Sequence, residues 1–413
     1  MRFIEGDSRP VRRGFILLTI MMAFFSMAMA YQQNIVTNYY EDILHLTGPE
    51  FGYITAIREV PGFLLIGVAA LFYKMSLPKL TALALLAQAA GYLFFGASNS
   101  FWTVTPWVII SSMGYHTVMQ TEYALGMSLT DEKKAGSILG KLTSIGSFGS
   151  LAAMAVVLVT FHYKILSYRP SFVVAGGLAL VAAAAVFTFP NLHNGREQKY
   201  LPTRDPIVFK KPYRLYYYLC LFDGARAQIF FSFGLWVLVN RYHMTVPQIS
   251  VLLIAVEAVR MVTSSWIGRM IDQLGEKQML IVMNGAYIVA LAGYALGADI
   301  AIAIACYAIY SLISGFSAVG EATYIRKIAS SRDVAPSLAM GVTLRHAAAI
   351  VVPVATGFIL NFVGYQIPFL VACVFAAIAI VVARRLDPLE QRTPEKIAED
   401  EALARVAVAV PAD

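Results

Sequence analysis

Apolar residues fall along this chain in runs of roughly 18 to 27 positions, separated by short polar breaks. A helix of about 20 apolar residues crosses the hydrocarbon layer of a bilayer, which is roughly 30 Å thick. The pattern therefore predicts an all-α integral membrane protein with twelve transmembrane helices. The predicted spans begin near residues 14, 49, 79, 102, 136, 170, 214, 246, 278, 300, 335 and 366.

The first apolar run has two interpretations. Two arginines at residues 12–13 precede an apolar stretch that reaches Ala-Met-Ala at 28–30, and this order resembles a secretory signal with its small-residue cleavage site. The stretch continues through residues 31–40, which favours a full transmembrane span. A full span is also needed as the counterpart of the seventh span in the internal repeat described below.

The amino-acid composition is typical of a membrane protein, and the distribution of charge argues against nucleic acid as a partner. Hydrophobic residues make up 58% of the 413 positions and charged residues 14%, whereas soluble domains are about half apolar and about a quarter charged. The net charge is +7, but Lys and Arg lie in short loops and form no continuous basic face, so nucleic acid is not an expected partner. Cys220, Cys306 and Cys373 lie in predicted spans without the spacing of a metal site, and we interpret them as packing residues.

The distribution of basic residues predicts the orientation in the membrane. With the amino terminus inside, 25 of the 32 Lys and Arg residues fall on the inner side and three fall in outer loops. Cytoplasmic segments carry such a positive excess. Both termini are therefore predicted to be cytoplasmic, and the chain is expected in the inner (plasma) membrane of a bacterium, surrounded by membrane lipid.

The chain divides into two predicted halves of similar plan. Residues 1–189 and 213–385 each hold six spans, residues 190–212 form a polar linker with no fold of its own, and residues 386–413 form a cytoplasmic tail. An offset of 198 or 199 residues relates charged positions of the two halves. These pairs are Glu59 with Glu257, Lys79 with Lys277, and Glu122 with Glu321.

The loop after the eighth span contains Gly268, Asp272, Gly275 and Lys277 in the order G-x-x-x-D-x-x-G followed by a basic residue. This loop resembles the inner-loop signature of the major facilitator superfamily, although the equivalent loop of the first half lacks the glycines and the acid. The resemblance implies two pseudo-symmetric six-helix bundles, with the loop acid helping to latch helices during gating. The alternative is a tight inner turn with solvated charges.

Other marks within that family are absent. The fourth span lacks the arginine that is common in proton-coupled members, and the fifth lacks the glycine-proline element of drug-proton antiporters. Small residues in the fifth span are expected to allow close helix packing.

Nine charged side chains lie well inside predicted spans, where each costs roughly 2.5 to 3.5 kcal/mol before it is paired. They occupy spans 2, 4, 7, 8, 10 and 11, which line the central cavity in the resembled fold. A hydrated passage between the halves is therefore expected. The nine are Arg58, Glu59, Glu122, Asp223, Arg226, Glu257, Arg260, Glu321 and Arg345.

Spacing predicts which of these charges neutralise each other locally. Asp223 with Arg226, and Glu257 with Arg260, are three residues apart on one helix face and can form ion pairs. Adjacent positions such as 58–59 point about 100° apart on a helix, so these two side chains are expected to find partners on other helices.

Arg345 has no acid in reach on its own helix, and with Arg226 or Arg58 it is a candidate for holding an anionic group of a substrate. The alternative for Arg345 is an interhelix salt bridge with Glu59, Glu257 or another acid. Polar residues of the first span, with aromatic walls beside them, are candidates for neutral contacts to the ligand or for bonds between helices. They are Tyr31, Gln32, Gln33, Asn34 and Asn38, with Tyr115, Tyr123 and Trp236 as the aromatic candidates.

The coupling proton is assigned to a carboxylate, since five acids in the spans face four arginines and one acid remains unmatched. Glu122 and Glu321 are the first candidates, because neither has a local base. The further candidates are Glu59, Glu257 and the histidines His116 and His346.

These features predict a secondary active transporter, expected to act as a monomer, that moves a small polar and anionic solute by alternating access with proton coupling. No HExxH, GxSxG or P-loop motif is present, so we expect no enzyme chemistry, ATP use, cofactor or metal. The alternatives are a proton-antiport exporter of drug-like or amphipathic compounds, an uncoupled facilitator, and a membrane sensor that does not transport.

Overall fold

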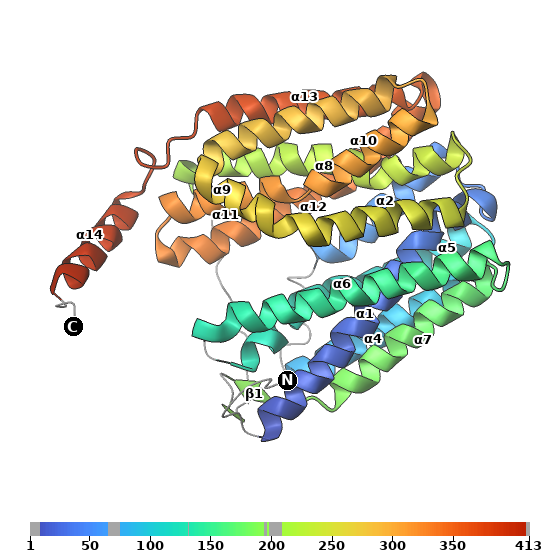
Figure 1. Cartoon of the computed structure of the whole chain (residues 1–413), viewed down its shortest axis with the longest axis horizontal. Coiled ribbons are helices and arrows are strands. Elements are labelled where there is room, and N and C mark those ends of the chain that lie inside the picture. The colour runs from blue at the N-terminus through green and yellow to red at the C-terminus, as the bar shows by residue number, and fades with distance from the viewer. Residues whose placement is uncertain (1–8, 65–74, 131, 194–195, 198–208, 410–413) are drawn as a thin grey trace. The chain divides into compact units, whose positions relative to one another are not determined.

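The computed structural model describes residues 9–64, 75–130, 132–193, 196–197 and 209–409, and the side chains of 132–135, 193, 196–197, 264–272 and 403–409 lie outside that description. Helices dominate it (Figure 1). Within these ranges, nine helices or helix segments are long and apolar enough to cross a membrane. The prediction of an all-α membrane protein is confirmed.

In the described part of the first half, six helices begin within a few residues of the predicted spans. In the segment 190–212, the described residues form a two-residue antiparallel strand pair and the start of a 3₁₀ turn, and the expectation that this linker has no fold of its own stays a prediction. The elements are α1 (Arg9–Asp42), α2 (Gly48–Phe63), α4 (Leu77–Phe95), α5 (Phe101–Ser128), α6 (Glu132–His162), α7 (Tyr168–Phe187), β1 (Leu192–His193), β2 (Arg196–Glu197) and η1 (Lys211–Tyr213).

Two breaks organise the helices of the second half. Gly275, with φ of 74°, divides α9 into the predicted eighth and ninth spans. Gly315, with φ of 93°, divides the predicted tenth span into α10 and α11, a break that hydropathy does not reveal. The elements are α8 (Arg214–Asn240), α9 (Val246–Leu296), α10 (Ile300–Ile313), α11 (Phe316–Ile328), α12 (Ser331–Val363), α13 (Gln366–Arg384) and α14 (Pro394–Ala409).

The turns before α2 and α9 are two copies of one structure. The sequences of residues 45–50 and 243–248 are His-Leu-Thr-Gly-Pro-Glu and His-Met-Thr-Val-Pro-Gln, and they are related by the same offset of 198 residues. His45 and His243 adopt φ of 51° and 52°. In each copy the backbone N–H of the threonine donates to the side chain three residues later. The distance is 2.9 Å from Thr47 to Glu50 and 2.8 Å from Thr245 to Gln248, and this bond caps the helix that follows.

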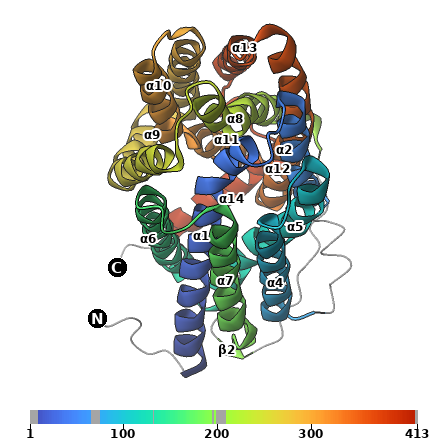
Figure 2. The same cartoon turned by 90° about the vertical axis from the view of Figure 1, so that its right-hand side faces the viewer.

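The chain divides into two compact units, residues 1–203 with 235–261 and residues 204–234 with 262–413. In the first unit, α4 packs against α5 and α7, and α1 packs against α6 and α7 (Figure 2). A Cβ added at Gly149 of α6 would lie 2.6 Å from the carbonyl oxygen of Ala23, so glycine is what permits this close approach of α6 to α1.

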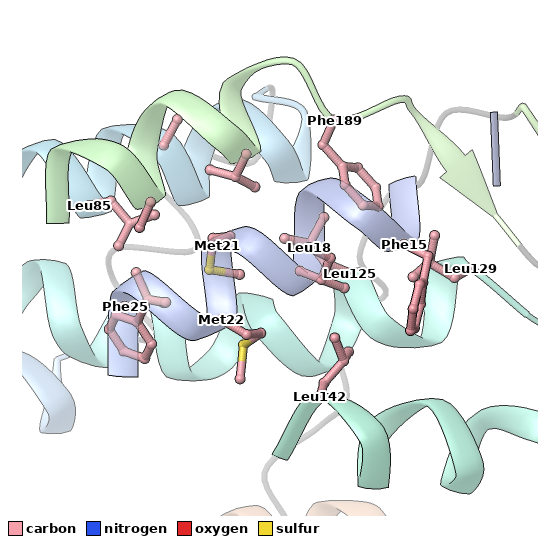
Figure 3. Close-up of a cluster of buried hydrophobic side chains, with 14 of the residues drawn as sticks. Phe15, Leu18, Met21, Met22, Phe25, Leu85, Leu125, Leu129, Leu142 and Phe189 are labelled. Atoms are coloured by element: carbon pink, nitrogen blue, oxygen red, sulfur yellow. The ribbon is translucent and has the colours of Figure 1, made fainter. Parts of the chain in front are cut away.

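Each unit has its own apolar core. In the first unit, residues 15–25 of α1 form one side of the core, and they pack against leucines of three other helices and against Phe189 (Figure 3). The core of the second unit is rich in tyrosine and lies around the beginning of α8 and the ends of α11 and α13. It includes Tyr213, Tyr216, Tyr217, Tyr324, Ile325 and Leu386.

Candidate functional site

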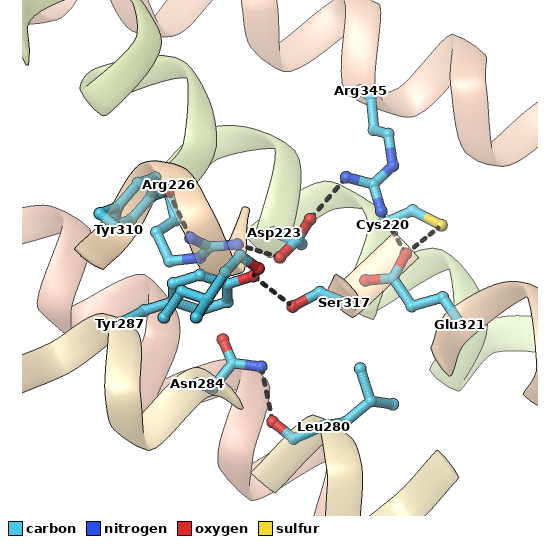
Figure 4. A network of polar contacts seen from close by, with 11 residues as sticks. Cys220, Asp223, Arg226, Leu280, Asn284, Tyr287, Tyr310, Ser317, Glu321 and Arg345 are labelled. Atoms are coloured by element: carbon cyan, nitrogen blue, oxygen red, sulfur yellow. Dashed lines mark hydrogen bonds and ion pairs between the residues drawn. The ribbon is translucent and has the colours of Figure 1, made fainter. Parts of the chain in front are cut away.

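Four charged side chains meet inside the second unit (Figure 4). Asp223 and Arg226 come from α8, Glu321 comes from α11 and Arg345 comes from α12. Asp223, Arg226 and Glu321 are only 2 to 5% exposed, whereas the side chain of Arg345 is 26% exposed. With two acids and two arginines, the cluster carries no net formal charge.

A glycine sets the distance between two of these helices. Gly224 lies next to Asp223 on α8, and a Cβ added there would lie 3.1 Å from the backbone of Arg345. The absence of a side chain therefore lets α12 approach α8 closely enough for an arginine to reach an acid on the facing helix.

The guanidinium of Arg345 joins two carboxylates. Its Nη1 donates to Oδ2 of Asp223 at 2.6 Å, and its Nη2 forms an ion pair with Oε2 of Glu321. Sequence reasoning left two roles open for Arg345, an anion site and a salt bridge with another helix. The structure places Asp223 and Glu321 beside Arg345, and the sequence analysis had covered them only as another acid.

Arg226 is more deeply enclosed than Arg345. It forms an ion pair with Asp223, as its spacing predicts, and its Nη1 donates to the hydroxyl of Tyr310. Its guanidinium carbon lies 3.6 Å from the ring centroid of Tyr287, a cation–π contact. The two tyrosines were missed as site residues, and the available signal was that a tyrosine deep in an apolar span needs a partner for its hydroxyl.

Glu321 uses only one of its two oxygens. Its Oε2 faces Arg345 and accepts a hydrogen bond from the thiol of Cys220 at 3.2 Å. Its Oε1 is buried and has no hydrogen-bond partner among the described residues. Cys220, interpreted from the sequence as a packing residue, is therefore also a polar contact of this carboxylate.

Arg58 and Glu59 were expected to find partners on other helices, which holds for Glu59 but not for the ion pair of Arg58. Nη2 of Arg58 lies 3.1 Å from Oε1 of Glu59, and Oε2 of Glu59 lies 3.8 Å from Nε2 of His116 on α5. Directions 100° apart describe the Cβ atoms of adjacent residues, but the long arginine side chain spans that angle and reaches its neighbour.

Of the five acids inside the predicted spans, Glu122 is the one without a cationic partner among the described residues. The predicted pair is present at Glu257 and Arg260, where Oε2 and Nη1 are 3.2 Å apart. Glu122 has no such ion pair, its Oε2 is buried without a hydrogen-bond partner, and it faces the apolar side chains of Met22, Leu139 and Leu142. The unmatched carboxylate of the sequence count is therefore on α5.

The remaining predicted substrate and proton candidates are dispersed over their helices. Oδ1 of Asn34 accepts a hydrogen bond from Ser250 at 2.8 Å, so this amide bonds another helix. Gln32, Tyr115 and His346 are half-buried, and Gln33 is exposed.

The predicted gating loop is only partly described. Gly268 and Asp272 lie in the stretch 264–272, whose surroundings are outside the description. Lys277 is exposed, and Gly275 makes the bend in α9. The neighbouring Glu276, which was not predicted, forms an ion pair with Lys327 of α11 at 2.6 Å.

The sequence matches one protein family over most of its length. The family model described as Major Facilitator Superfamily matches residues 15–340 and 220–411. No curated protein matches the chain by sequence.

Solved structures share the fold at low sequence identity. The nucleoside transporter NupG is 14% identical with a TM-score of 0.73, over 92% of this chain and 98% of that one. A bacterial homologue of the human lysosomal transporter Spinster is 13% identical with a TM-score of 0.73, over 94% and 100%. The human organic anion transporter MFSD10 is 12% identical with a TM-score of 0.60, over 91% and 100%.

Proposed function

This chain belongs to the major facilitator superfamily of secondary transporters, and we propose that it carries a small polar anion together with protons by alternating access. The observation that supports the proposal is the position of the Arg345 guanidinium. It is the most exposed charged group of the cluster, and two carboxylates bind its two terminal nitrogens. The similar structures transport nucleosides in one case and organic anions in another, so the fold alone does not choose the solute.

The proposed coupling step is the protonation of Glu321. A proton on this carboxyl group removes the charge that attracts Nη2 of Arg345, so one arm of the guanidinium becomes available to an anionic group of the substrate. Asp223 keeps the other arm in place, because it remains bound to Arg226 as well. The arginine is thereby oriented while it changes partner.

Charge balance favours joint binding of a proton and an anion. The cluster is neutral before binding, and adding one positive and one negative charge leaves it neutral. Adding either one alone leaves a net charge in a poorly solvated place, which is costly. This mutual dependence is what a coupled carrier requires.

Glu122 is the second candidate for the proton in this proposal. It has no cationic partner in the described part of the chain, and an isolated carboxylate in a membrane favours its neutral form. Glu122 and Glu321 lie on helices that the internal repeat relates, so each is a candidate for the same task in its own half.

Uptake into proteoliposomes tests the proposal. Labelled organic anions, amino acids, sugars and nucleosides are offered with and without a pH gradient, and we expect uptake of an anion that the gradient drives. Glu321→Gln is expected to abolish gradient-driven uptake while anion exchange continues, and Arg345→Ala is expected to abolish both. Glu122→Gln tests the second carrier, and Asp299→Asn, a helix cap outside the cluster, is the control.

Two results contradict the proposal. Transport that is unchanged in Arg345→Ala shows that this guanidinium does not hold the substrate. Gradient coupling that survives both Glu321→Gln and Glu122→Gln shows that neither carboxylate carries the proton.

A further inference from the structure

Helix ends in the first unit line an open cavity of about 720 Å³, which lies within the size range of sites for small organic ligands. Its walls are the ends of α1, α6 and α8 and the beginnings of α7 and α9, which the predicted topology places on the outer side. All the residues that line it belong to this one unit. None of them belongs to the cluster around Arg345.

Within the described part of the chain, two side chains of the cavity wall have an acceptor oxygen without a donor. Asn38 is 2% exposed, and its Nδ2 donates to the carbonyl of Met244 at 2.8 Å, but its Oδ1 receives no hydrogen bond from any described residue. Oε1 of Glu41 accepts from Asn240 at 2.8 Å, and its Oε2 receives no hydrogen bond from the same set of residues. The two residues are three apart on α1, so the two acceptors lie on one helix face.

Unpaired buried acceptors are unfavourable, and they indicate which kind of group is missing. Both atoms are oxygens, so the complementary group is a hydrogen-bond donor. A ligand that only accepts hydrogen bonds, such as a carboxylate, would leave both atoms unpaired and would add repulsion from Glu41. The wall therefore favours a donor over an acceptor.

The charged and aromatic side chains of the cavity indicate which class of hydrogen-bond donor fits it. Glu41 and Asp42 supply two carboxylates, and Lys164 is the one lysine or arginine among the lining residues. The ring centroids of Phe161 and Tyr168 lie 5.4 Å apart, and both rings line the cavity together with the acids. Carboxylates next to aromatic faces are a suitable environment for an organic cation.

We propose that this cavity is a binding site for a small organic ammonium ion. The ammonium N–H groups donate to Oδ1 of Asn38 and Oε2 of Glu41, and the hydrocarbon part packs on Phe161 and Tyr168. Both oxygens are buried, so binding turns these side chains toward the cavity. The site is separate in residues and opposite in ligand charge from the proposed anion site, and it does not depend on that proposal.

Binding to the purified full-length protein in detergent tests the site with three probes of one shape. Phenethylamine carries an ammonium group, phenethyl alcohol is its neutral counterpart and phenylacetate is its anionic counterpart. We expect saturable binding of phenethylamine by calorimetry, with at least about tenfold weaker binding of the alcohol and the acid. Glu41→Gln preserves the shape and the acceptor for Asn240, and it is expected to weaken phenethylamine binding by about tenfold or more.

Asp299→Asn, which removes an acid outside the cavity, is expected to bind phenethylamine as the unmodified protein does. The site is refuted if phenethylamine shows no saturable binding at millimolar concentration, or if Glu41→Gln binds it unchanged. The comparison of amine with alcohol uses the unmodified protein alone. Equal affinity for those two probes also refutes the proposal, even when the variant does not fold.

Discussion

At the scale of single residues, spacing predicts local ion pairs but not the contacts between helices. Asp223 with Arg226 was predictable because residues three apart share a helix face. The contacts of Arg345 with α8 and α11 depend on how far each helix is rotated and how closely Gly224 lets two of them approach. Neither quantity is contained in the hydropathy of a span.

Tyr287 provides a test of the enclosure of Arg226. Tyr287→Phe keeps the ring under the guanidinium and loses the hydroxyl, whereas Tyr287→Leu loses both. We expect Tyr287→Leu to lower the free energy of unfolding by about 2 kcal/mol more than Tyr287→Phe, because the cation–π contact is desolvated. Unfolding in detergent measures the difference.

The same two substitutions in a protein without Arg226 isolate the cation–π contact of Tyr287. In Arg226→Met the guanidinium is absent, so the difference between the phenylalanine and leucine variants is expected to shrink. A difference that keeps its full size in that background would show that the ring acts by packing alone.

At the scale of elements, hydropathy and turn signals were sufficient to predict where most helices begin. They did not predict the break at Gly315. A single glycine inside an apolar run is tolerated in a helix, so residues 300–328 read as one span. The break has a consequence for the site, since Tyr310 lies before it and Glu321 lies after it.

Gly315→Ala is expected to reduce stability by about 1 to 2 kcal/mol, because φ of 93° is unfavourable for a residue with a Cβ. No neighbouring atom lies within 4 Å of the added Cβ, so the cost is in the backbone alone. Thermal unfolding of the purified protein measures it. Gly285→Ala, also in open space but with no such φ, is the control, and an equal loss in both variants would contradict this account.

The beginning of α14 is expected to loosen in acid. Hydrogen bonds from Lys396 and Arg392 hold the pKa of Asp400 below its usual range. This contribution is present above the pKa that the residue has when unfolded, about 3.9, and it is lost as pH falls through the lower folded value. Amide hydrogen exchange of residues 394–400 at neutral and acidic pH measures the change.

Asp400→Asn serves as the comparison for this pH effect. It is expected to show the faster exchange already at neutral pH and to respond less to acid. If acid lowers the protection against exchange equally in both proteins, relative to the unfolded rate at each pH, the effect belongs to other groups.

At the scale of the whole molecule, the inner loop and the repeated plan were sufficient to predict the family, but the role of the tail was not predictable. The backbone N–H of Thr393 donates to the carbonyl of Ile328 at 3.0 Å, and Glu399 accepts from the backbone N–H of Ser331 at 2.9 Å. Asp333, in the same region, binds Lys210 at 2.5 Å. Hydropathy does not report such contacts, because they join segments distant in the sequence. That the charged spans face a hydrated passage stays a prediction.

Glu399→Ala is expected to release the turn between α11 and α12. The carboxylate accepts from the backbone and the hydroxyl of Ser331, and the loss is expected to cost about 1 to 2 kcal/mol and to speed amide exchange at residues 330–334. Hydrogen-exchange mass spectrometry measures this region directly. Glu390→Ala removes an exposed acid of the same tail, and similar exchange in the two variants would mean that the tail does not hold the turn.

The paired turns at residues 45–50 and 243–248 have a consequence for the ancestry of the chain. Five of the six positions keep the same or a similar residue type, and the left-handed histidine and the capping bond are also shared. Duplication of an ancestral gene that encoded six helices is the simplest explanation. Descendants of one ancestral turn remain interchangeable as long as their surroundings have not diverged. A chimaera that carries the second turn in both places is then a viable protein.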